Sequence, residues 1–504
     1  MTSGALSALA ERALKWSALT TVARFVLQLG AQIALARLLG PGNYGVYGIS
    51  LTVLTFVAFL SGGAFSWSLM LAPTLSRDDI RFSFTWQMVA GVLAAIAMYA
   101  AAPAIAVFFG DPRVEGMVQL LSLASLLSAA SAPATCLLQR DLNFRVLGLV
   151  QLASYAAGYL CVGIPMALNG YGAYALGAAC VVQAGVTLVA AYAARPHPVR
   201  PLFSHAGGSV ALKTGQAVFL TNVVNWLLTN LDRVVIGRVL NPHAVGLYTV
   251  AYNLASIPNV LLVGALQPAF LAAGAKLQQE PGRLAQGWLW GVACVLVLVT
   301  PAAVVLGLLS ADLVALLYGP AWTDTGWVLA LFFLCLPAWA CWGLSTPILW
   351  NTGRRNMEFL LQMPLIAVAV PAWWLLAPSG IRAAAVVSAL VILARAGVII
   401  TAALKALDLR WSAILGFAAR GLGLSVVCGA AVLAGQRAVA GLSFPGAALF
   451  AGGTFAMAAM IVLVGTAPQL LGPEAQGALA RLFPFLKDRL NPPLPATELD
   501  GLPR

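Results

Sequence analysis

The sequence predicts an all-α integral membrane protein. We expect about fourteen transmembrane helices, with two parallel-related six-helix lobes around a central cavity and two further C-terminal helices. Composition, the length of the apolar segments and an internal repeat predict this fold class. Of the 504 residues, 61% are hydrophobic and only 9% are charged, and the mean hydropathy is +0.91. Soluble proteins are typically about 25% charged, so this chain has too little polar surface for a water-exposed globule of its size.

The long apolar segments are expected to be helices, because lipid offers no hydrogen-bond partner to exposed backbone groups. About 20 residues are needed to cross the hydrocarbon core. Charged or Gly/Pro-rich breaks delimit fourteen such segments: 16–36, 46–71, 84–109, 116–138, 146–168, 171–194, 214–236, 246–271, 284–317, 326–350, 358–377, 383–404, 412–434 and 445–467. The segment 284–317 is long enough to be tilted in the membrane or broken at Pro301.

The positions of Lys and Arg predict the orientation in the membrane. If the N-terminus is cytoplasmic, nineteen of the 28 Lys and Arg residues fall on the cytoplasmic side, five on the opposite side and four inside the segments. This bias is typical of multi-pass membrane proteins, and it accounts for the net charge of +12 without nucleic acid as a partner. We therefore expect a cytoplasmic N-terminus (1–15), a first six-helix repeat (16–194), a cytoplasmic linker (195–213), a second six-helix repeat (214–404), helices 13 and 14 (405–470) and a cytoplasmic tail (471–504).

Cysteine and histidine usage gives no sign of a metal or a cofactor. The seven cysteines all fall within expected membrane segments and show no C-x-x-C spacing, and the three histidines are scattered over loops. Small apolar packing roles are the expected function of such cysteines. We therefore predict neither a metal site nor a cofactor.

One short motif occurs twice. ALARLLGPGNYGVYGIS, beginning at Ala34, aligns without gaps with VIGRVLNPHAVGLYTVA, beginning at Val235. The identities at an offset of 201 are Arg37/Arg238, Leu39/Leu240, Pro41/Pro242, Gly45/Gly246 and Tyr47/Tyr248. Each copy joins the first and second helices of a six-helix unit, and an even number of helices makes the two units enter the membrane in the same direction. Parallel repeats of this kind place substrate sites at the interface between repeats.

Each copy of the motif follows a helix that carries a polar stripe. Helical spacing places the members of each stripe on one face. The first stripe consists of Ser17, Thr21, Arg24, Gln28 and Gln32, and the second consists of Asn222, Asn225, Thr229 and Asp232, with Arg233 beside it. A charged side chain near the bilayer centre costs about 2.5–3.5 kcal/mol on insertion scales, so such stripes are expected to face water, a partner or a substrate. Two stripes at equivalent positions predict a shared hydrophilic cavity.

Structural readings of the same residues stay open. An ion pair between Arg24 and Asp232 would hold the two repeats together without binding substrate. Arg395 and Arg420 could reach a membrane interface along their own helices. Polar residues in other segments could serve as helix–helix hydrogen-bond partners; they include Gln87, Gln151, Gln183 and Asn253. Trp226 stands out among the aromatic residues because of its polar neighbours.

Several strings resemble the polysaccharide transport family of oligosaccharide flippases, which shares a superfamily with multidrug exporters and lipid II flippases. They are LARLLGPGNYGVY, LLQRDLNFRVLGLVQLAS, NGYGAYALG, LLTNLDRVVIGRVLNPHAVGLYTVAYNLASIP and LLYGPAWTDTGWVLAL. The resemblance runs in order from about residue 16 to 405 and includes the duplication. The chain departs from it at Arg233, where relatives often have a small or amide residue, and in the stretch Gly62–Met70.

The resemblance implies a non-enzymatic flippase. Such a protein carries undecaprenyl-diphosphate-linked oligosaccharide repeat units across a bacterial inner membrane, with polymerase and export machinery as partners. Guanidinium groups suit the diphosphate, which implies Arg24 and Arg233. Amides suit sugar hydroxyls, which implies Gln28, Gln32, Asn222 and Asn225, and Asp232 is the candidate for coupling to an ion gradient.

Other classes of protein make different sequence predictions. A cation-coupled multidrug exporter of the same superfamily is the alternative, although we expect such an exporter to use several intramembrane acids. A polymerase or ligase would need a long outward loop with catalytic side chains, and a glycosyltransferase would need a soluble nucleotide-sugar domain. The sequence has room for neither.

Overall fold

The computed structural model describes residues 3–61, 69, 75–205, 226–227, 229–277, 280–441 and 446–482. These residues are helical almost throughout and include no strand, which confirms the all-α class. The chain forms two compact units, Met1–Thr249 and Val250–Arg504. The boundary lies within one helix rather than in the linker, and the repeat boundaries expected from the sequence remain predictions.

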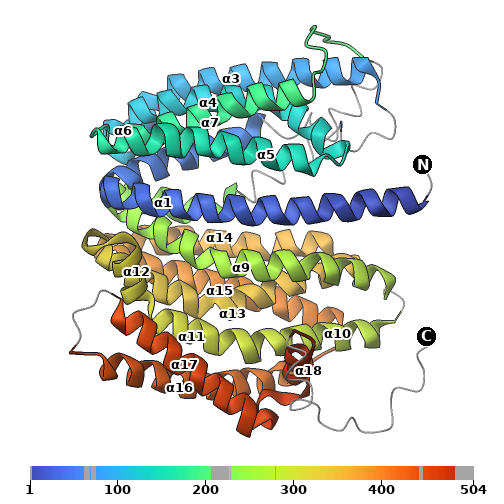
Figure 1. Ribbon diagram of the computed structural model, residues 1–504, viewed down its shortest axis with the longest axis vertical. Coiled ribbons are helices and arrows are strands. Elements are labelled where there is room, and N and C mark those ends of the chain that lie inside the picture. The colour runs from blue at the N-terminus through green and yellow to red at the C-terminus, as the bar shows by residue number, and fades with distance from the viewer. Residues whose placement is uncertain are drawn as a thin grey trace. The chain divides into compact units, whose positions relative to one another are not determined.

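The first unit is built from long helices that run side by side (Figure 1). Helix α4 packs against both α3 and α7, and α5 packs against α1 and α7. The bounds are α1 Ser3–Ser61, α3 Arg77–Phe109, α4 Arg113–Arg140, α5 Phe144–Tyr155, η1 Ala156–Gly163, α6 Ile164–Leu168 and α7 Tyr174–Ala194, followed by helical residues 229–239 and the start of α9 Pro242–Lys276.

Helix α1 contains two helices that meet at Gly40. The backbone there leaves the helical region (φ 70°, ψ 170°), a conformation that glycine adopts at little cost because it has no Cβ. Pro41 then opens the second helix, where its missing N–H is not needed. The sequence therefore placed this break correctly, between segments 16–36 and 46–71.

Helices α5, η1 and α6 together form one candidate membrane span, Phe144–Leu168. Its middle is a π-helical segment, Ala156–Gly163. Gly158 lies so close to α7 that a Cβ there would collide with the carbonyl oxygen of Ala179. The glycine thus permits a close approach of two helices, as small residues do in membrane bundles.

The second unit continues α9 and adds two groups of neighbouring helices (Figure 1). Helix α13 packs against α11 and α15, and α16 packs against α11 and α17. The bounds are α10 Pro281–Cys294, η2 Val295–Val299, α11 Thr300–Leu308, α12 Ser310–Tyr318, η3 Pro320–Trp322, α13 Thr323–Asn351, α14 Arg355–Leu376, η4 Ala377–Ser379, α15 Ile381–Ala406, α16 Ser412–Ala438, α17 Ala447–Thr466, η5 Pro468–Leu471 and α18 Gly472–Leu482.

The expected break at Pro301 is not where the structure breaks. Pro301 lies in the first turn of α11, directly after the π-helical segment η2. A proline removes a backbone hydrogen bond and clashes with the carbonyl four residues earlier, and we attribute the local widening to this effect. The helix ends at Leu308, and α12 begins at Ser310 as a separate helix.

Twelve helices within the described residues are long and apolar enough to cross a membrane. The first, Thr20–Ala58, overlaps two of the expected segments, 16–36 and 46–71. The expected segment 214–236 lies mostly outside the described residues. The multi-pass membrane class is therefore confirmed, whereas the count of fourteen stays a prediction.

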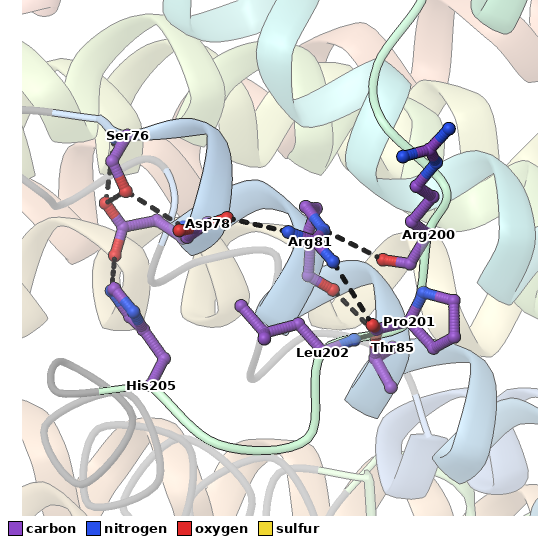
Figure 2. A network of polar contacts seen from close by, with 9 residues as sticks. Ser76, Asp78, Arg81, Thr85, Arg200, Pro201, Leu202 and His205 are labelled. Carbon is purple, nitrogen blue, oxygen red and sulfur yellow. Dashed lines mark hydrogen bonds and ion pairs between the residues drawn. The ribbon is translucent and has the colours of Figure 1, made fainter.

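The start of the linker is bound to the N-terminal end of α3 (Figure 2). Arg81 Nε donates to the carbonyl oxygen of Arg200 at 3.1 Å, and the backbone N–H of Leu202 donates to Thr85 Oγ1 at 2.8 Å. His205 Nε2 lies 2.8 Å from Asp79 Oδ1. Residues 200–205 therefore lie beside the first turns of α3.

The two copies of the repeated motif touch each other within the first unit. A Cβ on Gly45 would collide with the carbonyl oxygen of Pro242, and a Cβ on Gly246 would collide with the carbonyl oxygen of Pro41. Each glycine thus faces the proline of the other copy. The sequence identities coincide with a reciprocal contact.

Candidate functional site

The first polar stripe lies on one continuous helix. Arg24, Gln28 and Gln32 are all half-buried on the part of α1 before Gly40. They follow one another at intervals of four residues, so they share a face. Arg24 and its neighbours fall inside the candidate span Thr20–Ala58.

Arg24 is held by a neutral partner. Its Nη1 donates to Gln151 Oε1 on α5 at 2.6 Å. Within the described part of the chain, no carboxylate forms an ion pair with Arg24. The glutamine orients the guanidinium and leaves its charge in place, and such a cation attracts an anion in a medium of low dielectric.

A cluster of tyrosines supports the helix that carries this stripe. Tyr155 O–H donates to the carbonyl oxygen of Gln28 at 3.5 Å. The rings of Tyr155 and Tyr159 are stacked with centroids 4.4 Å apart, and the hydroxyls of Tyr159 and Tyr47 are 3.0 Å apart. All three tyrosines are buried. Their contacts with one another and with the backbone at Gln28 support the helix that carries the stripe.

Asp232 is buried and held from two sides. Its side chain is 7% exposed. Tyr248 O–H, from the start of α9, donates to Asp232 Oδ2 at 2.5 Å, and the backbone N–H of Arg233 donates to Asp232 Oδ1 at 2.7 Å. The carboxylate therefore links residues 229–239 to α9 across the turn at Pro242. Arg233 Nη1 in turn donates to Asn230 Oδ1 at 2.8 Å.

The contact between Tyr248 and this carboxylate was not predicted from the sequence. Its duplication was visible, since Tyr47 occupies the equivalent position in the first copy. The two tyrosines have different partners, because Tyr47 contacts Tyr159 and Tyr248 contacts Asp232. The repeat thus indicated that a tyrosine is retained at this position in both copies, but it could not show which groups each tyrosine contacts.

The ion pair considered between Arg24 and Asp232 is not formed. Arg24 contacts Gln151 on α5, whereas Asp232 contacts Tyr248 and the backbone of Arg233. Each side chain therefore hydrogen-bonds to a different group. The structural alternative for these two residues is therefore wrong in the form the sequence suggested.

Trp226 is described by the structure, whereas two of the expected site residues near it are not. Asn222 and Asn225 lie outside the described residues. Trp226 is 7% exposed; its Nε1 donates to Thr55 Oγ1 at 3.0 Å, and its ring lies 4.7 Å from that of Phe56 between centroids. Trp226 therefore packs against the second part of α1 and is not an open binding surface.

A polar group in the second unit was underestimated from the sequence. The sequence left open that Arg395 reaches a membrane interface; in the structure its Nε donates to Gln362 Oε1 at 2.9 Å. Its guanidinium carbon also lies 4.3 Å from the centroid of the Trp342 ring. Spacing on a single helix could not reveal this, since the three residues come from α15, α14 and α13.

No group of three or more His, Cys, Asp or Glu side chains within the described residues could hold a metal ion. The polar atoms of the site are guanidinium, amide and hydroxyl groups with one buried carboxylate. Groups of these kinds can form hydrogen bonds with anions and with hydroxyl groups.

Comparisons with known proteins agree with the resemblance seen in the sequence. A family model described as "Polysaccharide biosynthesis protein" matches residues 34–326, which is more than half of the chain. Lipopolysaccharide biosynthesis protein WzxC of Escherichia coli (strain K12) is 26% identical over 333 residues, covering 64% of this chain and 65% of WzxC. Succinoglycan biosynthesis transport protein ExoT of Rhizobium meliloti (strain 1021) is 25% identical over 319 residues, covering 63% of this chain and 64% of ExoT. These matches span just under two thirds of each relative's length.

Solved structures show the same fold at low sequence identity. The lipid II flippase MurJ in an inward closed conformation superimposes with a TM-score of 0.68 at 13% identity, covering 89% of this chain and 98% of MurJ. An inward-facing multidrug resistance MATE family transporter superimposes with a TM-score of 0.59 at 13% identity, covering 76% of this chain and 94% of the transporter. The family match includes both copies of the repeated motif as well as Gln151 and Asp232. The chain belongs to the polysaccharide biosynthesis protein family.

Proposed function

We propose that this protein is a flippase for lipid-linked oligosaccharides. It moves undecaprenyl-diphosphate-linked repeat units from the cytoplasmic to the periplasmic leaflet of a bacterial inner membrane, for exopolysaccharide, capsule or O-antigen biosynthesis. The observation that carries the proposal is the Arg24–Gln151 pair, a cation held by a neutral amide inside a membrane span of a chain of this family. The names of WzxC and ExoT, a lipopolysaccharide biosynthesis protein and a succinoglycan transport protein, support it.

The chemistry of the cargo matches the chemistry of the stripe. The cargo is a hydrogen-bonding sugar chain on an anionic diphosphate, attached to a tail that prefers lipid. In our proposal Arg24 and Arg233 bind the diphosphate, since a guanidinium group keeps its charge and offers several donors. Gln28, Gln32, Asn222 and Asn225 bind sugar hydroxyls, since amides both donate and accept hydrogen bonds.

In the same proposal Asp232 couples transport to an ion gradient. A buried carboxylate inside a membrane protein is costly, and such groups often belong to transport pathways. Tyr248 O–H donates to Asp232 Oδ2 at 2.5 Å. In this proposal, binding or release of an ion at the Asp232 carboxylate therefore changes a contact at the start of α9. The termini are cytoplasmic, the protein is not an enzyme, and polysaccharide polymerase and export machinery are its partners.

A cation-coupled multidrug exporter remains the second candidate, because the multidrug resistance MATE transporter shares the fold. The two candidates differ in what the binding site must neutralise. A cationic drug needs acidic groups, whereas the stripe on α1 presents Arg24 and two glutamines. The polar groups near Arg24 therefore favour an anionic cargo.

The test uses a bacterial strain that lacks this protein. We expect lipid-linked oligosaccharide to accumulate with its sugar facing the cytoplasm, and the wild-type gene to relieve the accumulation. Arg24→Gln and Asp232→Asn copies should fail to do so, while Arg37→Gln, which changes an exposed arginine of the same helix, should succeed. Unchanged lipid-linked pools together with altered resistance to a cationic drug would support the exporter instead.

A further inference from the structure

Arg420 is a charged side chain on the exposed side of a membrane span. Helix α16, Ser412–Ala438, qualifies as a candidate span within the described residues. Between Ser412 and Arg437, every exposed residue of α16 other than Arg420 is Leu, Val, Ala or Gly. Charged side chains in membrane spans almost always face the interior of the bundle. The exposed position of Arg420 therefore requires a polar group at the membrane surface, which its long side chain can reach.

Arg420 differs from the other arginines of the expected membrane segments. Arg24, Arg233 and Arg395 each donate to an amide oxygen of the protein. Within the residues that the structure describes, Arg420 takes part in no hydrogen bond and no ion pair. Because a guanidinium group carries several donors and keeps its charge, its acceptors must come from water or from the lipid around the helix.

Helix α18 has an arginine at each end. At its start, a Cβ on Gly472 would collide with Arg420 Nη1, so the glycine lets the guanidinium of α16 lie against this helix. At its end, the guanidinium carbon of Arg481 lies 5.8 Å from the centroid of the Trp290 ring on α10. Arg481 is exposed, and Trp290 is 36% exposed. Helix α18 thus reaches from α16 to α10, and both arginines lie on the surface of the unit Val250–Arg504.

The two spans that hold α18 run in the same direction. Gly421 of α16 lies against the carbonyl group of Leu296, and Gly429 lies against the side chain of Leu308. Both of these leucines belong to the span Pro281–Leu308. Because the later glycine meets the later leucine, the first residues of the two spans are at the same end of the unit.

Helix α18 lies at a similar depth in both spans. Arg420 is about 12 Å from the first residue of α16, and Trp290 is about 14 Å from the first residue of α10. Apolar residues at the start of α18 face the bundle and join a core cluster formed by Val297, Leu424, Val464, Leu471 and Ala475. A helix with one apolar side and exposed charges is typical of the membrane interface, where tryptophan is also enriched. Arg420 and Arg481 are therefore at the depth of the lipid head groups.

Glu474 places a negative charge beside Arg420. Its Oε2 lies 3.3 Å from the position that a Cβ on Gly472 would occupy. Among the ion pairs of the described residues, none joins Glu474 to Arg420. The carboxylate is therefore close enough to weaken the attraction of an anion to Arg420, and its removal should strengthen that attraction.

We propose that Arg420 and Arg481, at the two ends of α18, form a docking surface for anionic phospholipid. The phosphate group of the head group accepts hydrogen bonds from the guanidinium groups, and its net negative charge matches their positive charge. Phosphatidylcholine carries a compensating cation, so the surface selects an anionic lipid such as phosphatidylglycerol. This surface is independent of the cargo: binding of phosphatidylglycerol by a protein that moves no lipid-linked oligosaccharide would refute the flippase and leave the surface in place.

The experiment maps lipid contacts on purified full-length protein in phosphatidylcholine nanodiscs. The discs contain a small fraction of photoactivatable phosphatidylglycerol or, in parallel, phosphatidylcholine with the same photoreactive group. After irradiation, chymotryptic peptides are analysed by mass spectrometry, since substitution of arginine leaves the chymotrypsin sites unchanged. In wild type, phosphatidylglycerol should label peptides from residues 412–424 and 468–481 more strongly than phosphatidylcholine does. Arg420→Gln should lower the phosphatidylglycerol labelling about fivefold, as expected for loss of one arginine near anionic lipid.

Two further variants sharpen the test. Arg437→Gln is the matched control, because it changes an exposed arginine in the last turn of the same helix, about 26 Å from Arg420 along the axis. It should leave the labelling of these peptides unchanged. Glu474→Gln should raise the labelling, because it removes the nearby negative charge.

Three results would overturn the proposal. The first is equal labelling of these peptides by the two lipids in wild type, and the second is unchanged labelling in Arg420→Gln. The third is loss of the phosphatidylglycerol label when undecaprenyl diphosphate is added, which would assign Arg420 to the substrate. If Arg420→Gln does not fold, Arg481→Gln tests the same surface, and unchanged labelling in that variant would also overturn the proposal.

Discussion

Gly45 and Gly246 occupy the same position in the two copies of the repeated motif, and each packs against the backbone of the other copy. A Cβ on Gly45 would collide with the Pro242 carbonyl and lie 3.0 Å from the backbone nitrogen of Gly246; a Cβ on Gly246 would collide with the Pro41 carbonyl and lie 3.1 Å from the nitrogen of Gly45. The duplication therefore preserves a contact between the copies. Both glycines are needed for it, because a carbonyl group on the backbone cannot easily move aside.

Gly45→Ala and Gly246→Ala should each destabilise the protein. Forcing a methyl group into a closed backbone contact typically costs about 1–3 kcal/mol. The measurement is the melting temperature of the purified protein in detergent. Gly48→Ala is the matched control, because a Cβ there would lie 3.6 Å from its nearest neighbours, Thr249 and Val245, an ordinary contact distance. Equal melting temperatures for all three variants would show that the motif copies do not hold this contact in solution.

Gln151→Glu should slow transport without unfolding the protein. The new carboxylate would pair with Arg24, which now donates to Gln151 at 2.6 Å, and would compete with the anionic cargo. A merely structural pair would be kept or strengthened by this change, so loss of transport at unchanged melting temperature distinguishes binding from support. We expect a fall of at least about tenfold in transport rate, the size expected when one charged hydrogen bond is lost. Full activity in Gln151→Glu would argue against Arg24 as an anion ligand.

Tyr248→Phe should lower the stability of the protein, because it removes the hydroxyl that donates to the Asp232 carboxylate. Removing the hydroxyl leaves a buried carboxylate oxygen without the donor that now lies at 2.5 Å, and such a loss costs about 1–3 kcal/mol. Tyr47→Phe removes the equivalent hydroxyl of the first motif copy, which lies 3.0 Å from the uncharged hydroxyl of Tyr159, so a smaller effect of about 1 kcal/mol is expected. Denaturant or thermal unfolding of both variants measures the difference. A larger effect for Tyr47→Phe would contradict the role assigned to Tyr248.

His197 should make the stability of the protein depend on pH. Burial lowers the pKa of this linker histidine from its ordinary value of 6.5, because the charged ring is poorly solvated among Tyr192 and Phe84. A lowered pKa in the folded state means that the folded state binds a proton less readily than the unfolded state. The stabilising contribution is complete above about pH 6.5 and is lost as the pH falls through the lower folded value. The melting temperature of wild type should therefore drop more than that of His197→Gln as the pH is lowered from about 7.5 to about 5. Parallel curves would rule out the effect.

The general architecture was predictable from the sequence because lipid imposes it. Long apolar segments must become helices, and the break at Gly40 follows from a Gly-Pro pair. The pairing of helices was not predictable, since hydropathy does not say which helices are neighbours. Arg24 was therefore predicted to be a binding residue without its partner Gln151, and the contact of Arg395 with Gln362 on another helix was not foreseen.

The turn at Asp232 shows the same limit in more detail. Its position on a polar stripe was evident from spacing, but the stripe suggested Arg24 as a partner. The partner is Tyr248, sixteen residues further along the chain. Helix periodicity relates residues on one helix, whereas this contact crosses a turn at Pro242 and depends on the angle between two helices. A duplicated tyrosine was the available signal.

The most direct test of the account is transport by purified protein in proteoliposomes that contain labelled undecaprenyl-diphosphate-linked oligosaccharide. The fraction of sugar accessible to an external glycosidase reports movement between leaflets. We expect wild type to equilibrate the label between leaflets, Arg24→Gln to slow this by at least about tenfold, and Arg37→Gln not to slow it. Equal rates in protein-free vesicles and in vesicles with wild type would contradict the account.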